Sequence, residues 1–500
     1  MLPMVAFVIG ALMILHFRPQ STETRPPRFY VPSSDKVAIN AKVDGSCCSK
    51  HKSQYMTLDP TRKYLINSFT MKPVFVVGDS PWSLQVQLSN NDIELYLHDR
   101  AARGFNAIWV GLADNTYSNS PPHDFYGNVP FNGPDFTNEN PAYWTRVDHT
   151  MWLASADGIT VFASPAFVGY GCKVGYCESY RRTPTEVVHA YGRFLGNRYK
   201  EFPNIVWVIG GDADPADSNV QSKLYALAQG IRSADASHLI TTENYRGSSS
   251  EDIWAEAPWL DINGVYMTPN DIPAKANSDY LASKHPLLMF EDWYEGEHSV
   301  TELEVRKEGY WAVLSGCTLG RFFGNGSIWN FNWPAQASPA WKTQLSSAGS
   351  VGQARLGSLF RSRQHWKLVP DIDHSLMTAG YDSRSLYSLA KETILNTVYR
   401  QAFRSDNMLS VAARTSDGQT IIAYVPSGSA SKIDIDMTKI TDSKQKTKCW
   451  WFNPRDGSTL LIGIFPAAGT RTFTAPDSND WVIVIDSQDA NLSPPGRGIL

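Results

Sequence analysis

Two apolar runs in this 500-residue chain each end in a carboxylate. Residues 205–212 read Ile-Val-Trp-Val-Ile-Gly-Gly-Asp, and residues 287–291 read Leu-Leu-Met-Phe-Glu. Each run has the continuous apolar character of a strand buried on both faces, as found in parallel sheets. Two carboxyl groups that meet in one site can cleave a glycosidic bond, one as acid/base and the other as nucleophile. Asp212 and Glu291 are therefore the candidate catalytic residues, although either acid could instead cap the next helix or turn.

The elements that must position these two acids form a repeating pattern of strands and helices. Apolar runs predict strands at residues 73–79, 105–111, 159–165, 205–212, 238–244, 262–266, 287–291 and 317–324. Helical stretches separate them, such as the one that Ser89 can cap and Gly104 can end. This alternation predicts a (β/α)8 TIM barrel, whose catalytic groups sit at the carboxyl ends of the strands. Asp212 and Glu291 would then end strands four and seven, across one barrel mouth.

The character of the sequence changes along the chain and predicts five segments. Their expected bounds are 1–18 for a signal peptide or signal anchor, 19–55 for an irregular arm, 56–404 for the barrel, 405–487 for a small antiparallel β-sandwich, and 488–500 for a tail. The hairpin signal Asp417-Gly418 between two short β-rich runs supports the sandwich. We therefore expect a secreted protein, with an N-terminal membrane anchor as the alternative.

Composition and cysteine use limit the possible partners. The net charge of −4 gives no electrostatic footprint for nucleic acid, and an aromatic content of 12% points weakly to carbohydrate. Cys172 and Cys177 lie five residues apart in a loop-like stretch and predict a local disulfide. Local zinc-site spacings are missing from the sequence, so we expect no metal and no cofactor. The expected partner is an oligo- or polysaccharide, with no membrane contact beyond a possible anchor, and the oligomeric state stays open.

Polar and aromatic side chains follow the other predicted strands, as a sugar-binding site requires. Carboxylates and amides can bind sugar hydroxyls, and aromatic faces can stack on sugar rings. The candidate substrate-binding residues are Asp79, Trp82, Asn115, Tyr117, Phe167, Asn244, Tyr266, Trp293, Glu295, Asn325 and Trp329. Glu295 also competes with Glu291 for the role of nucleophile, but Glu291 directly follows an apolar strand, where its position is better fixed. Asp292 should point away from Glu291 if strand alternation continues.

Four stretches of the chain resemble the apiosidase-like glycoside hydrolases. They are Gly-Asp-Ser-Pro-Trp at 78–82, Arg-Ala-Ala-Arg-Gly-Phe-Asn at 100–106, the block at 191–212 that ends in Gly-Gly-Asp, and Gly-Asn-Gly-Ser-Ile-Trp at 324–329. The C-terminal β-rich region resembles the small domain, named for collagen binding, that usually follows. The resemblance spans about residues 58 to 486. It implies a retaining mechanism on a pectic or related glycan, with Asp212 as acid/base and Glu291 as nucleophile.

The sequence departs from the family pattern around the expected sugar. Ser80-Pro81 replaces Thr-Ala, Met289-Phe290 precedes the strand-seven acid where the family usually has Gly or Asp-Gly, and Gly326 stands where Asn is common. The sugar is therefore left open, and another furanose or a pentose would fit the same chemistry.

Two other classes of function are compatible with the sequence. The first is a non-catalytic protein, in which a glycosidase-derived barrel binds a glycan or a matrix component. The second is a metallohydrolase, which the scattered positions of the eleven histidines disfavour. The intact pair of acids favours the hydrolase over both.

Overall fold

The computed structural model describes residues 54–498 apart from 215, 334–339, 382–408 and 429–431. The predicted leader, nearly all of the predicted arm and the predicted boundary at residues 404 and 405 lie outside the described residues. Within the described part of the chain, no helix is both long enough and apolar enough to cross a membrane.

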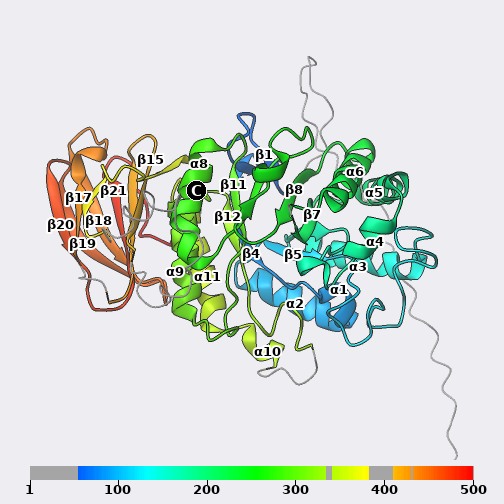
Figure 1. The fold of residues 1–500 in the computed structure, drawn as a ribbon. Coiled ribbons are helices and arrows are strands. Elements are labelled where there is room, and N and C mark those ends of the chain that lie inside the picture. The colour runs from blue at the N-terminus through cyan, green and yellow to red at the C-terminus, as the bar shows by residue number, and fades with distance from the viewer. Residues whose placement is uncertain (1–53, 215, 334–339, 382–408, 429–431, 499–500) are drawn as a thin grey trace, which may run out of the picture. The chain divides into compact units, whose positions relative to one another are not determined.

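Parallel strands form a barrel in the order β8-β7-β6-β5-β4-β12-β11-β10, and β9 (Ser248–Ser249) adds to β10 antiparallel (Figure 1). Their bounds are β4 Val76–Asp79, β5 Ala107–Gly111, β6 Thr160–Ser164, β7 Ile205–Ala213, β8 Leu239–Asn244, β10 Asn263–Tyr266, β11 Leu287–Glu291 and β12 Gly320–Phe323. The two ends of this order, β8 and β10, lie side by side, so the sheet nearly closes. The predicted TIM barrel is therefore confirmed.

Aromatic rings fill the interior of the barrel below its mouth. Phe290 of β11 and Phe322 of β12 stack with ring centroids 5.2 Å apart, and Phe162 of β6 packs edge-on against Phe322 at 4.9 Å. Gly78 of β4 leaves room for this layer, because a Cβ there would lie 2.3 Å from the Phe322 ring. The rings make a packed floor, as is usual for such barrels, so a ligand can enter only above it.

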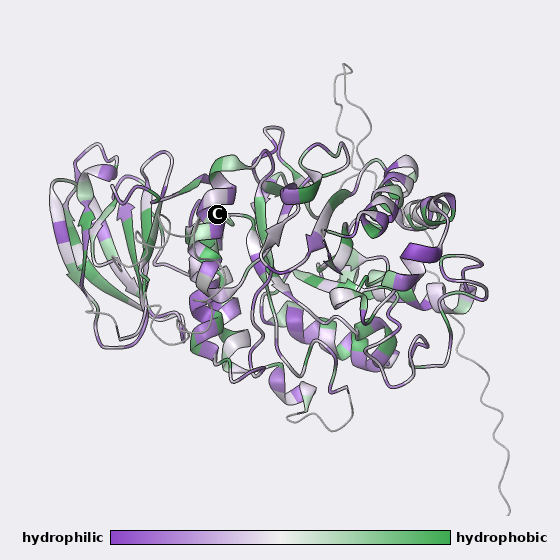
Figure 2. Cartoon of the chain, in the orientation of Figure 1, coloured by the Kyte–Doolittle hydropathy of each residue, from purple (hydrophilic) through white to green (hydrophobic). Residues whose placement is uncertain are grey.

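Helices cover the outside of the barrel. Their bounds are α1 Leu84–Gln87, α2 Asn90–Ala102, α3 Pro141–Ala156, α4 Cys177–Arg182, α5 Thr185–Tyr199, α6 Ser218–Ala234, α7 Glu251–Trp254, α8 Ile272–Ala282, α9 Glu302–Leu314, α10 Trp341–Gln344 and α11 Ala348–Arg361. Short 3-10 turns are η1 Tyr170–Cys172, η2 Pro269–Asp271, η3 His365–Lys367 and η4 Met437–Lys439. Ser89 caps α2 as predicted, by accepting the Asp92 N–H. Figure 2 shows apolar residues along the strands and mixed faces on the helices, as expected for helices between core and solvent.

Three small antiparallel sheets complete the described fold. Before the barrel lie β1 Thr57–Leu58, β2 Leu65–Asn67 and β3 Lys72–Val74. After it, β13 Leu368–Pro370, β15 Val411–Thr415, β16 Thr420–Val425, β21 Trp481–Ser487, β18 Lys446–Phe452 and β19 Thr459–Pro466 form one sheet, in this spatial order. A second sheet holds β14 Met377–Ala379, β17 Lys432–Asp436 and β20 Thr470–Thr474. Side chains of both sheets share one apolar core, which makes the pair a sandwich as predicted.

Buried ion pairs join the sandwich to the barrel helices within the single compact unit that residues 51–500 form. Arg306 of α9 binds Asp480 at 2.7 Å, and Arg363, just after α11, binds Asp486 at 2.7 Å. Removal of one partner from either buried pair would leave an uncompensated charge, which is strongly destabilising.

Candidate active site

The predicted acid Asp212 stands in a bulge at the end of β7. Gly210 and Gly211 have φ angles of 110° and 98°, and Asp212 has a φ of 54°, so three consecutive residues are left-handed. The ladder between β7 and β8 is regular up to Gly210 opposite Glu243, and Gly211 and Asp212 then fall outside it. A Cβ at Gly211 would lie 2.7 Å from the ring of Phe167, so the turn needs glycine there. The bulge places Asp212 at the barrel mouth.

An irregularity in the register of β11 turns the side chain of the second predicted acid, Glu291, toward the barrel mouth. Met289 pairs in register with β10, but the next pair joins Glu291 to Tyr266 and skips Phe290. Strict alternation would turn Glu291 to the side of Met289, which packs against the outer helices. The skipped residue returns Glu291 to the mouth, where its carboxyl is close enough to Asp212 and Tyr266 for both to change its pKa.

A third carboxyl group, Glu243 of β8, contacts the bulge of β7 and was not among the predicted site residues. It is 2% exposed near the end of β8. Its Oε2 accepts the main-chain N–H of Asp212 at 2.6 Å, and its Oε1 has no hydrogen-bond partner among the described residues. The sequence did carry a signal, because Glu243 is an acid near the end of a predicted strand, as Asp212 and Glu291 are.

Burial controls the charge state of these three acids. Burial raises the pKa of Asp212 to about 6, and the guanidinium of Arg246 opposes part of the rise. Burial also raises the pKa of Glu291, the charge of Asp212 raises it further, and Arg246 and a hydrogen bond with Tyr266 lower it. The pKa of Glu243 rises well above its usual range because of burial and the other two acids. The cluster therefore keeps protons above the pH at which exposed carboxyls lose them, as a general acid requires.

Arg246, two residues beyond β8, is the cation of this cluster and was also missed from the sequence. Its Nη2 and Nε donate to the hydroxyl oxygen of Tyr266 at 3.1 and 3.3 Å. The Tyr266 hydroxyl can then use its own proton for Glu291. Tyr266 and Arg246 thus favour the ionised form of Glu291, and Arg246 also favours that of Asp212, but burial and the charge of Asp212 still hold the pKa of Glu291 well above its usual range.

Four predicted aromatic residues line the mouth together. Trp82 packs edge-on against Phe167 with centroids 5.0 Å apart, Phe167 lies 5.7 Å from Tyr117, and Tyr117 packs edge-on against Trp329 at 5.0 Å. Burial raises the pKa of Tyr117 to about 12, and the charges of Asp212 and other acids at the mouth add to this. The Tyr117 hydroxyl therefore stays protonated next to the acids, as a donor that a sugar oxygen could accept from.

Three predicted polar residues use their side chains inside the protein. Asp79 is fully buried, where its Oδ2 accepts hydrogen bonds from Tyr96 at 2.7 Å and Arg100 at 3.2 Å. The amide nitrogen of Asn115 donates to the Gly175 carbonyl in the loop after β6 at 3.0 Å, and that of Asn244 donates to the Ser249 carbonyl of β9 at 3.1 Å. These contacts stabilise the segments around the mouth, so the three residues act as structural supports of the site.

Glu295 and Asn325 form a second supporting cluster. Glu295 Oε2 accepts the Asn325 amide at 3.0 Å and the Ser347 hydroxyl, and its Oε1 accepts the Gly349 N–H at 2.8 Å. The carboxylate thus lies at the N-terminus of α11, where a negative charge is favoured. Trp293 is partly buried against the outer core. With both oxygens bound by the protein, Glu295 is poorly placed to compete with Glu291 as nucleophile.

Asp292 turns away from the mouth, as predicted. Its two oxygens accept hydrogen bonds from Arg321 Nη2 at 3.0 and 2.8 Å, and Arg321 Nη1 donates to the Val305 carbonyl of α9. Glu308 of α9 is buried nearby, and the charge of Asp292 helps to raise its pKa. Asp292 therefore belongs to the layer between strands and helices.

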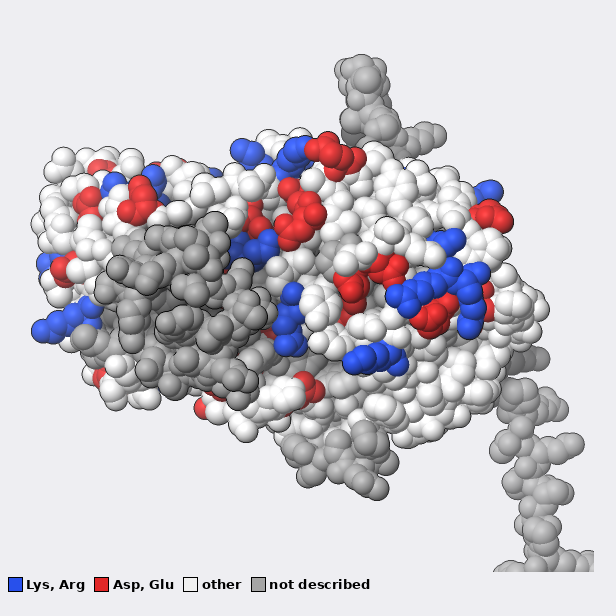
Figure 3. Space-filling model, in the orientation of Figure 1, with Lys and Arg blue, Asp and Glu red and all other residues white. Residues whose placement is uncertain are grey.

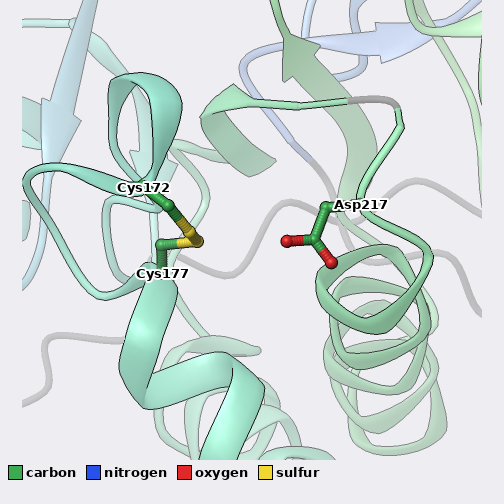
Figure 4. A group of neighbouring side chains, drawn as sticks. All are labelled: Cys172, Cys177 and Asp217. Carbon is green, nitrogen blue, oxygen red and sulfur yellow. A yellow bond between two sulfur atoms is a disulfide. The ribbon is translucent and has the colours of Figure 1, made fainter.

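A disulfide between Cys172 and Cys177 closes the loop after β6, as predicted (Figure 4). The Gly169 N–H of this loop donates to the Gly211 carbonyl at 3.0 Å, so the loop holds the bulge that carries the candidate acid. The two cysteine sulfurs and a carboxylate oxygen of Asp217 lie within 4.8 Å of one another. Because each sulfur is bonded to the other, neither offers the thiolate that a metal ion would need.

A hollow of about 580 Å³ lies at the opposite end of the barrel, where Asp261 precedes β10 and Lys284 precedes β11. Its charged groups are bound to one another: Asp261 accepts from Arg62 at 2.7 Å and Arg232 at 2.6 Å. Basic and acidic side chains are interspersed on the face that Figure 3 shows. Since TIM-barrel enzymes place their chemistry at the carboxyl ends of the strands, this hollow is a solvated surface and the active site lies at the mouth.

A (β/α)8 barrel with two acids at the ends of strands four and seven defines the class of a glycoside hydrolase. The sequence matches the catalytic domain of the apiosidase-like family over residues 59–367, and the chain belongs to that family. Residues 396–486 match a family described as "Putative collagen-binding domain of a collagenase".

Two solved structures share the fold. One, a glycoside hydrolase, is 23% identical with a TM-score of 0.72, and the match covers 88% of this chain and 99% of the other. The second, a family 5 glycoside hydrolase from Bacteroides vulgatus ATCC 8482, is 22% identical with a TM-score of 0.72, over 88% and 96%. At these identities the likeness shows the fold, and no curated protein sequence matches the chain.

Proposed function

We propose that the protein is a retaining glycosidase of the plant cell-wall type, with Asp212 as acid/base and Glu291 as nucleophile. The observation that carries the proposal is that both acids leave the regular ladder of their strands and interact electrostatically at one mouth. Family membership supports a pectic or related glycan, with apiose or a similar furanose or pentose at the scissile bond. The four aromatic residues at the mouth, Trp82, Phe167, Tyr117 and Trp329, would contact the sugar.

The proposed roles place the one proton of the pair on Asp212 when the sugar is bound. Burial and the charge of Asp212 raise the pKa of Glu291, and Arg246 and the hydrogen bond with Tyr266 oppose this and favour its ionised form. Glu291 would attack the anomeric carbon while Asp212 gives its proton to the leaving oxygen, which yields a glycosyl ester on Glu291 and a free alcohol. Asp212, now ionised, would take a proton from water, whose oxygen attacks the anomeric carbon and releases Glu291. After the first step the pair holds the glycosyl group in place of the proton, and after the second step the proton is back on Asp212, so the net charge of the pair is the same throughout.

Hydrolysis by wild type, Asp212→Ala and Glu291→Ala should be compared on aryl glycosides and pectic oligosaccharides. Loss of either carboxyl is expected to lower kcat by about 100-fold to 10,000-fold or more. Asp214→Ala, an exposed acid two residues after Asp212, is the matched control and should keep wild-type activity. Full activity in either test variant refutes the role given to that residue. Glycan binding without hydrolysis by the wild type would favour the binding-protein alternative.

Azide tests the nucleophile separately. With Asp212 intact, Glu291→Ala leaves a cavity from which azide can attack an activated aryl glycoside directly. We expect a glycosyl azide of inverted configuration. Its absence, in a variant that still binds the glycoside, would count against Glu291 as the nucleophile.

We further propose that the chain is exported. The apolar leader at residues 1–18 and the disulfide between Cys172 and Cys177 support this. Expression of the full chain with a C-terminal tag, followed by cell fractionation, should find it outside the cytosol. Retention of all tagged protein in the cytosol would refute the proposal.

A further inference from the structure

We propose that Glu243 is a positioning residue that holds the main chain of Asp212 in the bulge through the N–H···Oε2 hydrogen bond. The inference rests on the proposed role of Asp212 as acid/base. The bond is 2.6 Å long and both partners are fixed, Glu243 by the regular end of β8 and Asp212 by the left-handed bulge of β7.

The bulge needs such a partner because it has left the β-ladder. The carbonyls of Gly210 and Gly211 accept N–H groups from Val168 and Gly169 of the loop after β6, at 3.4 and 3.0 Å. The N–H of Asp212 points to the other side, where Glu243 accepts it. The bulge is therefore held from two sides, and the Glu243 side sets the peptide bond from which the acid side chain projects. A small rotation of that peptide would move the Asp212 carboxyl away from the leaving oxygen, which is enough to impair proton transfer.

The surroundings of Glu243 favour a neutral carboxylic acid in this position. Asp212 of β7 and Glu291 of β11 face it with like charge, and they and burial raise its pKa. Arg246, the cation beyond β8, acts on Asp212 and Glu291 instead. With Oε1 buried and without a partner among the described residues, the acid can keep its proton there and still accept on Oε2. A neutral acceptor can be replaced by glutamine, whereas a nucleophile or a base cannot.

Two glycosides separate this role from a merely structural one. A phenyl glycoside needs its leaving oxygen protonated, and a 2,4-dinitrophenyl glycoside does not. Glu243→Ala should lose about 100-fold in kcat on the phenyl glycoside and only a few-fold in the first step on the dinitrophenyl one, as Asp212→Ala should. Glu243→Gln should stay within a few-fold of wild type on both. An equal loss on both glycosides in Glu243→Ala, or a Glu243→Gln as inactive as Glu291→Gln, would overturn the proposal.

Hydrogen exchange of the full chain tests the bond without any substrate. Amide exchange in the peptide that contains Asp212 should speed up at least 10-fold in Glu243→Ala and stay near wild type in Glu243→Gln, with both variants folded by circular dichroism. If Glu243→Ala does not fold, Glu243→Asp takes its place, because it keeps the carboxyl group but is one methylene too short, and it should show the same faster exchange. Unchanged exchange in the tested variant overturns the proposal. A wild type that hydrolyses no glycoside would refute the proposed function and leave this result standing.

Discussion

Asp212, the buried acid that the proposed mechanism needs, should make the folded protein less stable at neutral pH. Burial raises the pKa of Asp212 from 3.8 to about 6. Below pH 3.8 the folded and unfolded chains both carry the proton, so Asp212 has no effect on stability. Between these values the unfolded chain ionises first, so stability falls as the pH rises, and above pH 6 the full penalty applies. At about 1.4 kcal/mol per pKa unit, this penalty is about 3 kcal/mol.

Asp212→Asn removes the ionisation and keeps the size of the side chain. We expect it to raise the free energy of unfolding by up to about 3 kcal/mol at pH 8 and by much less at pH 4. With about 2 cal/mol/K of unfolding entropy per residue, a barrel of this size would gain about 5 °C in Tm at pH 8. Thermal unfolding by tryptophan fluorescence across this pH range measures the difference, with the exposed Asp214→Asn as control. A gain independent of pH, or a loss at pH 8, would refute the reasoning.

Three further changes test the elements that support the site. Gly211→Ala puts a methyl group 2.7 Å from an aromatic ring at a φ of 98°, and should lower kcat at least 10-fold in a folded protein; wild-type kcat would contradict the role of the bulge. Replacing Cys172 and Cys177 together by serine should lower kcat even at temperatures well below Tm, where the variant is folded, because the loop holds the bulge in place. An unchanged kcat would mean that the bulge does not need this support. Arg321→Met leaves Asp292 buried without its partner and should lower the free energy of unfolding by about 3–5 kcal/mol at pH 8, measured by urea titration. At pH 5 the loss should be smaller, because Asp292 has a pKa of about 6 and is mostly protonated there. An equal loss at both pH values would show that charge is not the cause.

The fold could be predicted because each barrel strand coincides with an apolar run in the sequence. The runs ending at Asp212 and Glu291 appear as β7 and β11 at their predicted places. The starts of strands one and eight were the least accurate. Pro73 and Val74 belong to β3 and β4 begins at Val76, while β12 begins at Gly320, with a φ of 118°, three residues after Cys317. A sequence window does not show where a glycine ends a turn and where it begins a strand.

The direction in which each side chain points could not be predicted, because it depends on the register between neighbouring strands. Alternation along β11 alone would send Glu291 toward the helices, and the skipped Phe290 is visible only against β10. Asp79 and Glu295 have residue types suited to a sugar site, but distant segments supply Arg100 and Gly349 as their partners. Glu243 lies near the end of a predicted strand, as Asp212 and Glu291 do, but its partner is a backbone N–H of another strand, which the sequence does not show.

The assignment of the nucleophile is tested most directly by trapping the covalent intermediate. An activated 2-deoxy-2-fluoro glycoside of the preferred sugar should inactivate the wild type and add one sugar to the intact mass. Peptide mapping should place that sugar on Glu291, and Glu291→Ala should stay unlabelled. A label on Asp212 or Glu243, or an unlabelled enzyme whose product forms with inverted configuration, would contradict the account.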